Sequence, residues 1–389
     1  MTDIVADPPA PSVNSQWVVV AIALAGTGLL ALGAMETAGW RKAALALVGA
    51  GFGIALYHAS FGFTSAWRNF LKERRGAGLR AQMVLFALTC LAAFPLLGAG
   101  EVFGQRIGGF VMPVGISLVF GAFLFGIGMQ LGGACASGTL YTAGGGNTRM
   151  AVTLIAFITG SVLATAHLPW WLSLYNVGSF SMIRSWGTGT ALGLHLILFA
   201  LIFLVSLSLE RKRYGSAESI GGPGVWLTGP WPKIWGAVAL AVLAILTFLL
   251  AGRPWGITSA FALWGAKAAH GIGYPIEEWA YWAPRAGALD RSLLFDTTTV
   301  MNVGIMLGAL AAAGLAGKYA PTARIGFRPL LAAVIGGLAM GYGARLAFGC
   351  NIGAYFSGIA SASAHGWVWA LAAIPGTMIG IRLRPLFRL

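Results

Sequence analysis

Charge is scarce in this sequence. Only 9% of its 389 residues are charged and 58% are hydrophobic, with a mean hydropathy of +0.79. Soluble domains carry roughly 25% charged residues, so this composition excludes an ordinary soluble domain. A helix needs roughly 20 apolar residues to cross a bilayer, and the runs here are that long and do not alternate as barrel strands do. We therefore predict an all-α polytopic membrane protein with about ten full spans.

Acidic side chains are the scarcer of the two charge types, since 11 Asp and Glu stand against 25 Lys and Arg. The basic residues form short clusters between apolar runs, as the positive-inside rule expects of cytoplasmic loops. We therefore attribute the net charge of +14 to membrane topology and exclude nucleic acid as a partner. No carboxylate lies plainly in a span, which argues against the relay of a proton-coupled pump and for facilitated passage.

Cysteine is rare as well. The three cysteines lie inside or beside apolar segments and do not resemble a disulfide framework. We predict neither a cofactor nor a metal site. Residues 1–15 are polar, acidic and rich in proline, so we expect a disordered cytoplasmic tail there and no cleavable signal.

The apolar runs divide the rest of the chain. We expect an extra N-terminal span in 16–41, a first half in 42–168, and a second half in 233–389. Residues 169–232 hold a loop, a linking span and a basic cytoplasmic linker. The predicted spans cover about 16–34, 42–60, 80–99, 109–130, 149–168, 188–209, 233–251, 298–317, 327–347 and 366–385.

Basic clusters predict the orientation. If ten spans are counted, three basic clusters fall on one side of the membrane, namely Lys72–Arg75, Glu210–Arg213 and Arg382–Arg388. That side is expected to be the cytoplasm, which makes the chain a multi-pass protein of the bacterial inner membrane with both termini inside. Arg41 and Lys42 fall on the other side, which a misplaced first span would explain.

Two motifs occur twice. GIGMQLGGACASG at Gly126–Gly138 returns as GYGARLAFGCNIG at Gly341–Gly353. FGFTSA at Phe61–Ala66 likewise returns as WGITSA at Trp255–Ala260. The order A, B, A′, B′ predicts two halves with the same architecture.

Each motif lies in an apolar segment that is too short to cross a bilayer: about 61–71, 133–142, 255–270 and 349–360. In the orientation above, the first two open from the cytoplasm and the last two from outside, so the halves are inverted repeats. Interrupted segments at matching positions are the best sequence pointer to a transporter's binding site. We expect four short re-entrant or broken helices to meet at a central constriction, because irregular backbone at that depth must be buried or line a cavity.

The segment starts predict the chemistry. A helix that begins at membrane depth presents free N–H groups and the positive end of its dipole, which favours an anion. Cys135 and Cys350 lie at equivalent starts, and a thiol is polarisable and a weak donor and acceptor. A single buried cysteine usually packs as a small hydrophobe, but two at one repeat position favour a pathway role. The ligand is then a small anion with a soft atom as well as oxygens.

The sequence closely resembles the YeeE/YedE family of sulfur-transport membrane proteins. The resemblance lies in GACASG around Cys135, GARLAFGCNIGAYFSG around Cys350 and the paired GxTSA segments. The resemblance covers both halves. It implies thiosulfate uptake through an hourglass-shaped protein, whose central cysteines pass the ion along by transient hydrogen bonds between thiol and sulfur. It also implies a TusA-like cytoplasmic sulfur carrier as partner. Cys135 and Cys350 match the family's two central cysteines, whereas Gly62 stands where a further cysteine belongs, which puts a three-thiol relay in doubt.

The remaining candidates surround these cysteines. Arg345 is an intramembrane cation that would hold an anion or position the break, unless it is a paired or snorkelling residue; Gln130 stands at the equivalent position. Gly49 and Gly53 are spaced for helix packing. The predicted pathway also includes backbone openings, hydroxyl donors and neighbours of the cysteines, namely Gly62, Gly133, Gly256, Gly349, Thr64, Ser65, Thr258, Ser259, Ser137 and Asn351.

Three other functions stay open. One is transport of a selenium or other sulfur compound by the same route. Another is an intramembrane sulfur-transfer enzyme that forms a persulfide on a cysteine, although no base is evident near either residue. A structural subunit without a pathway would keep uptake intact when both cysteines are changed. The expected partners are a small sulfur-containing anion, the sulfur carrier and membrane lipid.

Overall fold

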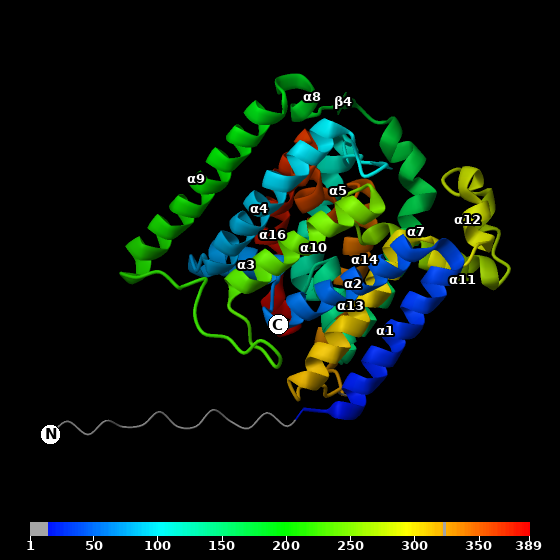
Figure 1. The fold of residues 1–389 in the computed structure, drawn as a ribbon, viewed down its shortest axis with the longest axis horizontal. Coiled ribbons are helices and arrows are strands. Elements are labelled where there is room, and N and C mark those ends of the chain that lie inside the picture. Colours follow the sequence, from blue (N-terminus) through cyan, green and yellow to red (C-terminus); the bar gives the residue numbers. More distant parts are fainter. Residues whose placement is uncertain (1–14, 322–323) are drawn as a thin grey trace.

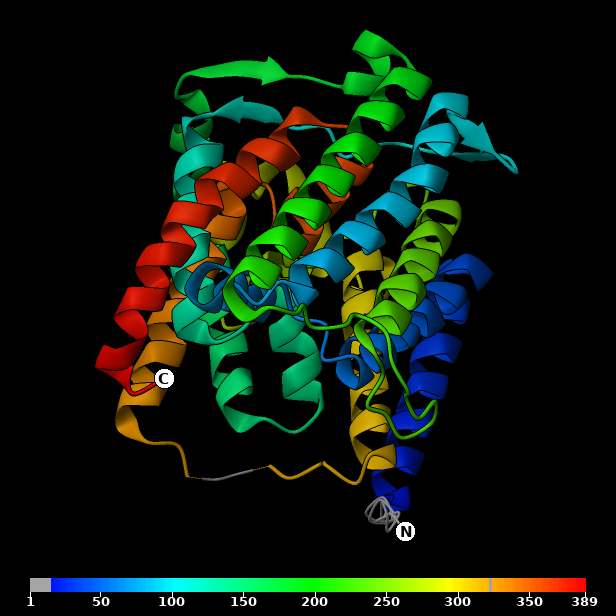
Figure 2. The ribbon, with the colours of Figure 1, turned by 90° about the vertical axis from the view of Figure 1, so that its left-hand side faces the viewer.

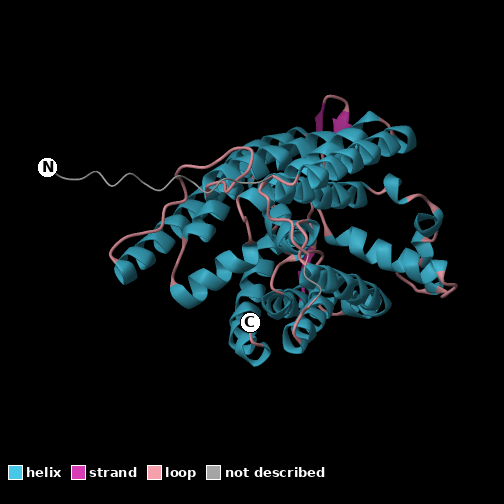
Figure 3. Cartoon of the chain, turned by 90° about the horizontal axis from the view of Figure 1, so that it is seen from below, coloured by secondary structure: helices cyan, strands magenta, loops and turns pink. Residues whose placement is uncertain are grey.

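Helices make up most of the computed structural model, which describes residues 15–321 and 324–389 (Figure 3). Within these residues, ten helical stretches are long and apolar enough to cross a membrane. The prediction of an all-α protein with about ten spans is therefore confirmed. The predicted N-terminal tail lies, apart from Ser15, outside the described residues.

The helix bounds follow the predicted spans closely. The α-helices are α1 (Trp17–Ala38), α2 (Trp40–His58), α3 (Phe63–Glu73), α4 (Ala77–Ala99), α5 (Ile116–Gly132), α6 (Ala136–Gly144), α7 (Thr148–Ser173), α8 (Met182–Trp186), α9 (Thr188–Tyr214), α10 (Lys233–Ala251), α11 (Thr258–Gly271), α12 (Gly287–Asp290), α13 (Thr297–Leu315), α14 (Phe327–Leu346), α15 (Ser357–Ala360) and α16 (Ala364–Leu383). A π-helix, η4 (Asn351–Phe356), precedes α15, and short 3-10 helices are η1 (Ile276–Glu278), η2 (Ala283–Arg285), η3 (Leu293–Phe295) and η5 (Arg384–Phe387).

The few strands lie at one end of the helix bundle (Figure 2). The strands β1 (Glu101–Val102) and β2 (Gln105–Arg106) pair antiparallel, as do β3 (Pro113–Gly115) and β4 (Asn176–Ser179). The predicted span at 109–130 begins later than expected, at Ile116, because the residues before it are extended and pair with β4. The start of α1 lies at the opposite end of the bundle.

The long helices pack in matching pairs across the two halves. In one set, α7 packs on α14, and α16 packs on α5. In another, α2 packs on α13, and α4 packs on α10. The helices of the two halves correspond in order, α2 to α10, α4 to α13, α5 to α14 and α7 to α16. When each helix is replaced by the corresponding one, the contact of α7 with α14 becomes that of α16 with α5, and the contact of α2 with α13 becomes that of α10 with α4. This is the pattern that two repeats would give, while their inverted orientation stays a prediction.

Two helices lie at the periphery. Figure 1 shows α1 and α9 at opposite edges of the bundle, where each exposes most of its apolar surface. The helix α1 contacts α13 and α2, whereas α9 contacts α4. The helix α1 therefore packs on one long helix of each half, and α9 packs on α4 of the first half.

Glycines allow α2 and α13 to approach closely. A Cβ atom on Gly53 would clash with the carbonyl oxygen of Ile305, and one on Gly308 would clash with that of Ala50. Gly49 meets the backbone of Met301 in the same way. The packing role predicted for Gly49 and Gly53 is thus confirmed, and small residues here replace side-chain packing with backbone contact.

A buried ion pair joins three segments at the end of the bundle where α4 begins. The Arg80 guanidinium donates to the Glu210 carboxylate at 2.7 Å, and their side chains are 2% and 0% exposed. Glu210 also accepts from the backbone N–H of Gly76 at 3.0 Å. A buried ion pair is tolerated only when its remaining hydrogen-bonding capacity is satisfied, as it is here.

Arg41 and Lys42 have partners at the other end of the bundle. The Lys42 ammonium donates to the carbonyl oxygen of Phe295 at 3.1 Å, and Arg41 contacts the side chain of Gln105. The first span does lie at Trp17–Ala38, so a misplaced span does not explain these two cations. They instead hold loops against the start of α2.

Gly53→Val is expected to destabilise the protein by about 1–3 kcal/mol, because the new side chain forces α2 away from α13. The measurement is the unfolding midpoint of the detergent-purified protein. Gly28→Val on α1 is the matched control, since no atom of the described residues lies within 4 Å of a Cβ at Gly28. Equal midpoints for the two variants would contradict this account of the interface.

Reporters fused after Arg75 and after Trp282 are expected on opposite sides of the membrane. Arg75 lies between α3 and α4, and Trp282 lies between η1 and η2 at the far end of the bundle. Activity of a cytoplasmic reporter at the first position and of an external reporter at the second would support the predicted orientation. The same reporter active at both positions would overturn it.

Candidate functional site

The repeated motifs lie at helix starts inside the protein. The N-cap residues are Gly62 for α3, Cys135 for α6, Ile257 for α11 and Cys350 for η4. The short helix α6 contacts η4 directly. The segments that begin at the two cysteines therefore contact each other, while the meeting of all four short segments at a central constriction stays a prediction.

Both cysteines occupy the same structural position. Cys135 and Cys350 have extended backbones before their helices and are 1% and 0% exposed. The Cys350 Sγ accepts a hydrogen bond from the backbone N–H of Ile352 at 3.4 Å, and the Cys135 Sγ lies 3.3 Å from the Ser137 Oγ. Both thiols are free. Soft sulfur thus lies at the electropositive end of two buried helices.

The chain turns sharply just before each cysteine. Gly133 adopts a left-handed backbone with φ of 96°, which glycine tolerates easily. In the second copy, Phe348 takes this role with φ of 61°. Gly349, which was predicted to open the backbone there, instead packs closely on the backbone of Gly353 and Ala354. A bulky residue in this conformation is strained and marks a position that the surrounding structure holds in place.

Several buried polar atoms of the repeated motifs make no hydrogen bond within the described residues. They include both side-chain polar atoms of Asn351, the Trp255 Nε1, the Thr64 Oγ1 and the Gln130 Oε1. Leaving such a group without a partner costs roughly 1–3 kcal/mol. Native proteins keep few of them, so each indicates strain, a ligand or a functional role.

A large cavity lies at the start of α11; we call it the α11 cavity. Its volume is about 520 Å³, and its wall includes Gly256, Thr258, Ser259 and the left-handed Phe348. Gly353 of η4 also lies in this wall, close in sequence to Cys350. Three residues predicted for the pathway, Gly256, Thr258 and Ser259, are therefore brought together, with the Ser259 hydroxyl donating to Thr298 at 3.1 Å.

Three guanidinium groups line the α11 cavity. Arg345 donates to the Tyr281 hydroxyl at 3.1 Å, Arg285 donates to the Tyr281 carbonyl at 2.7 Å, and Arg253 donates to the Thr298 hydroxyl at 3.2 Å. Within the described residues none of the three forms an ion pair. Arg345 lies in the last turn of α14, so it belongs to a cavity wall and not to the middle of the span. Sequence reasoning missed Arg253 and Arg285.

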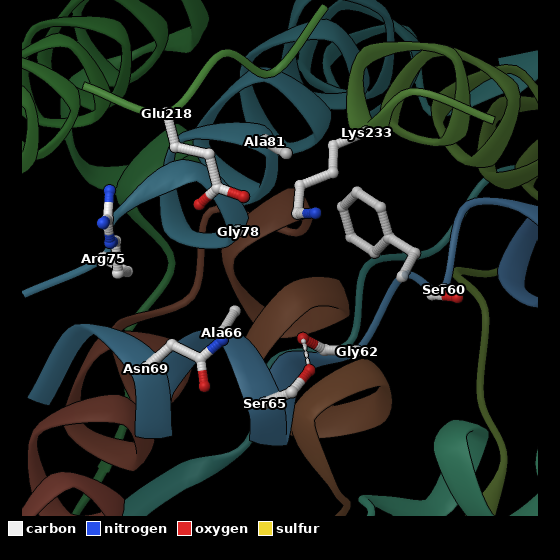
Figure 4. Close-up of a pocket in the computed structure, with 11 residues that line it drawn as sticks. Ser60, Gly62, Ser65, Ala66, Asn69, Arg75, Gly78, Ala81, Glu218 and Lys233 are labelled. Atoms are coloured by element: carbon white, nitrogen blue, oxygen red, sulfur yellow. Dashed lines mark hydrogen bonds between the residues drawn. The ribbon is translucent and has the colours of Figure 1, made fainter. Parts of the chain in front are cut away.

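A smaller cavity lies at the start of α3; we call it the α3 cavity (Figure 4). Its volume is about 100 Å³, and Gly62 and Ser65 line it, with the Ser65 hydroxyl donating to the Gly62 carbonyl at 3.3 Å. Arg75, Lys233 and Glu218 bring charge to the same wall. The two cavities thus lie at the two copies of the GxTSA motif.

Gln130 and Thr64 are both buried and contact each other. The Gln130 side-chain amide donates to the carbonyl oxygen of Thr64 at 3.3 Å. Arg384 donates to the carbonyl oxygen of Gln130 at 2.8 Å. Gln130 therefore does not face Arg345, although the two align in sequence, because each belongs to its own half.

Comparison with known proteins gives a consistent result. The family described as "Sulphur transport" matches residues 58–379. The chain is 36% identical over 169 residues to "Probable transporter YedE" of Escherichia coli (strain K12), a match that covers 42% of this chain and only 41% of that one. It is 29% identical over 378 residues to "Thiosulfate transporter TsuA" of Spirochaeta thermophila, covering 87% of this chain and 98% of the relative. The Escherichia coli protein of the same name is 23% identical over 345 residues, covering 85% of this chain and 91% of the relative.

These matches agree with the repeated cysteine motifs and with the ten helices long enough to span a membrane. Since the family match runs from residue 58 to residue 379, this multi-pass membrane protein belongs to the sulphur-transport family, the YeeE/YedE family.

Proposed function

We propose that this protein carries a small sulfur-containing anion, most simply thiosulfate, from the α11 cavity past Cys350 and Cys135 to the α3 cavity. The observation that carries the proposal is the position of the thiols. Cys135 and Cys350 belong to the same buried cluster as Trp255 of the α11 cavity wall and Phe61 of the α3 cavity wall. An ion that moves between the cavities would have to pass this cluster.

Electrostatics favours an anion at the α11 cavity. Its three guanidinium groups have no carboxylate partner within the described residues, and a cleft lined by one sign of charge concentrates ions of the opposite sign. The Trp255 indole in its wall and the Asn351 amide next to Cys350 offer buried N–H donors that have no partner among the described residues. The two thiols add polarisable sulfur, which suits an anion with a terminal sulfur atom better than one with oxygens alone.

Direction follows from the loops. The α3 cavity lies beside Arg75 and near Arg211–Arg213 at the end of α9, and basic loops are retained in the cytoplasm. We therefore place the α3 cavity at the cytoplasmic face of the inner membrane, with both termini inside. A TusA-like sulfur carrier that takes up the incoming sulfur fits this direction.

Non-covalent passage fits the thiols better than an enzymatic persulfide. The hydrogen-bonding partners of the two Sγ atoms are a serine hydroxyl and a backbone N–H, and neither is a base that would activate a thiol. Four relatives are named as transporters, two of them for thiosulfate. A selenium compound on the same route is the alternative substrate, since selenium shares the polarisability of sulfur.

Cys135→Ala and Cys350→Ala are each expected to lower thiosulfate uptake by about tenfold or more, which corresponds to roughly 1.4 kcal/mol of lost interaction. The measurement is growth on thiosulfate as the sole sulfur source, with labelled uptake, in a host without its own uptake systems. Cys90→Ala is the matched control, because Cys90 is also 0% exposed but lies in α4, outside the repeated motifs.

Full uptake by a Cys135→Ala/Cys350→Ala double variant would contradict the thiol pathway. Failure of the wild type to support growth while present in the membrane would move the substrate to a selenium or other sulfur compound. Intact-mass measurement after exposure to thiosulfate should show no added sulfur, whereas a stable persulfide would favour the enzyme.

Arg345→Gln is expected to raise the half-saturation concentration for uptake roughly threefold to tenfold, because one of three capturing charges is lost. The effect should shrink as ionic strength rises, since partly exposed charges are screened. Arg184→Gln is the control, as Arg184 is exposed on α8 at the same end of the bundle. An unchanged half-saturation concentration at low salt would remove Arg345 from the capture site.

A further inference from the structure

The two cavities differ in charge. Among the described residues, the α11 cavity is lined by three arginines and no acidic residue. The α3 cavity is lined by Arg75 and Lys233 together with Glu218, the only carboxylate in either wall among the described residues. Both cavities lie at equivalent motifs, so the repeat does not account for the acidic residue.

Glu218 belongs to the linker between α9 and α10, and its main chain is held on both sides. The buried Glu210 carboxylate accepts from the Glu218 backbone N–H at 3.2 Å, and the Arg80 guanidinium donates to the Glu218 carbonyl at 2.7 Å. Two residues on, the carbonyl of Ile220 accepts from the N–H of Ile234 in α10 at 2.9 Å. The ion pair between Arg80 and Glu210 thus fixes the linker over the cavity.

This anchoring turns the Glu218 side chain toward the cavity. Figure 4 shows the Glu218 carboxylate and the Lys233 ammonium extending into the same space above Gly62 and Ser65. The neighbouring cation, Arg75, lies 3.6 Å from Glu210 and over the ring of Tyr214, so part of its charge is already compensated. Within the described residues Glu218 itself forms no ion pair.

A carboxylate in this place has a clear electrostatic effect. It repels an anion in the α3 cavity and offsets the attraction of Lys233 and Arg75. An anion that several cations bind tightly at the exit of a pathway dissociates slowly. Transport therefore requires that the exit site have a low affinity for the ion. The described wall of the α11 cavity holds no such opposing charge and suits capture.

Building on the proposed function, we propose that Glu218 is the residue that promotes release: its carboxylate keeps the affinity of the α3 cavity for the transported anion low. The transported ion is then bound where three guanidinium groups face it and released where a carboxylate opposes it. Glu218 acts on the ion through charge and forms no bond with it.

The first test measures the charge of the α3 cavity without using the substrate. Asn69 lines this cavity and is exposed, so Asn69→Cys places a reactive thiol there, while the native cysteines are buried. The rates of modification by the anionic 2-sulfonatoethyl and the cationic 2-trimethylammonioethyl methanethiosulfonates are compared in inside-out vesicles. Glu218→Gln should raise the ratio of anionic to cationic rate roughly threefold at low salt, and high salt should abolish the difference.

Two controls separate charge from structure. Glu218→Asp keeps the carboxylate and should keep the wild-type ratio. Glu101→Gln removes an exposed carboxylate at the other end of the bundle and should also leave the ratio unchanged. The main-chain hydrogen bonds of Glu218 survive all these changes, so folding is not at issue. A Glu218→Gln ratio equal to that of the wild type would overturn the proposal.

The second test concerns release. In inside-out vesicles, Glu218→Gln should lower the half-saturation concentration for labelled thiosulfate several-fold, while right-side-out vesicles show an unchanged value. An unchanged value in the inside-out vesicles, despite a changed reagent ratio, would overturn the role in release. If wild-type vesicles carry no thiosulfate from either side, the proposed substrate fails, and the reagent ratio alone decides whether Glu218 opposes anions.

Discussion

Backbone hydrogen bonding at helix starts inside an apolar bundle is the constraint on which this structure depends. The first N–H groups of a helix have no partner within it, and in an apolar interior each needs one. At η4 the Cys350 thiol accepts from the N–H of Ile352, so the side chain that completes the helix start is also the one proposed to contact the ion. Stability and the proposed transport thus depend on the same few atoms, and in the described part of the chain the neighbouring Asn351 amide has no hydrogen-bond partner.

The charged residues are arranged differently at the two ends of the bundle. The cations of the α11 cavity are held by hydroxyl and carbonyl oxygens, so they keep their full charge for a ligand. At the other end, Glu210 and Glu218 compensate part of the charge of the basic residues around them. The two similar halves therefore have cavities that differ in charge. Such a difference suits the proposed passage of an anion from the α11 cavity to the α3 cavity.

The spans and broken segments could be predicted from the sequence because hydropathy and exact spacing are local signals. Cys135 and Cys350 stood out for the same reason, since the motif around them repeats. Phe348 could not be predicted, because its left-handed backbone is imposed by packing on a residue type that normally avoids it. The α11 cavity was missed in part because Arg253, Arg285 and Arg345 come from three separate segments, and only the fold brings them together.

The ion pair between Arg80 and Glu210 has a consequence for how the chain is made. The two residues are separated by 130 positions in the sequence. At synthesis rates of about 5–20 residues per second, Glu210 is therefore added roughly 10 s after Arg80. During this interval α4 carries an unpaired cation that the finished protein buries almost completely. The first half therefore cannot reach its final packing before α9, which carries Glu210, has been synthesised.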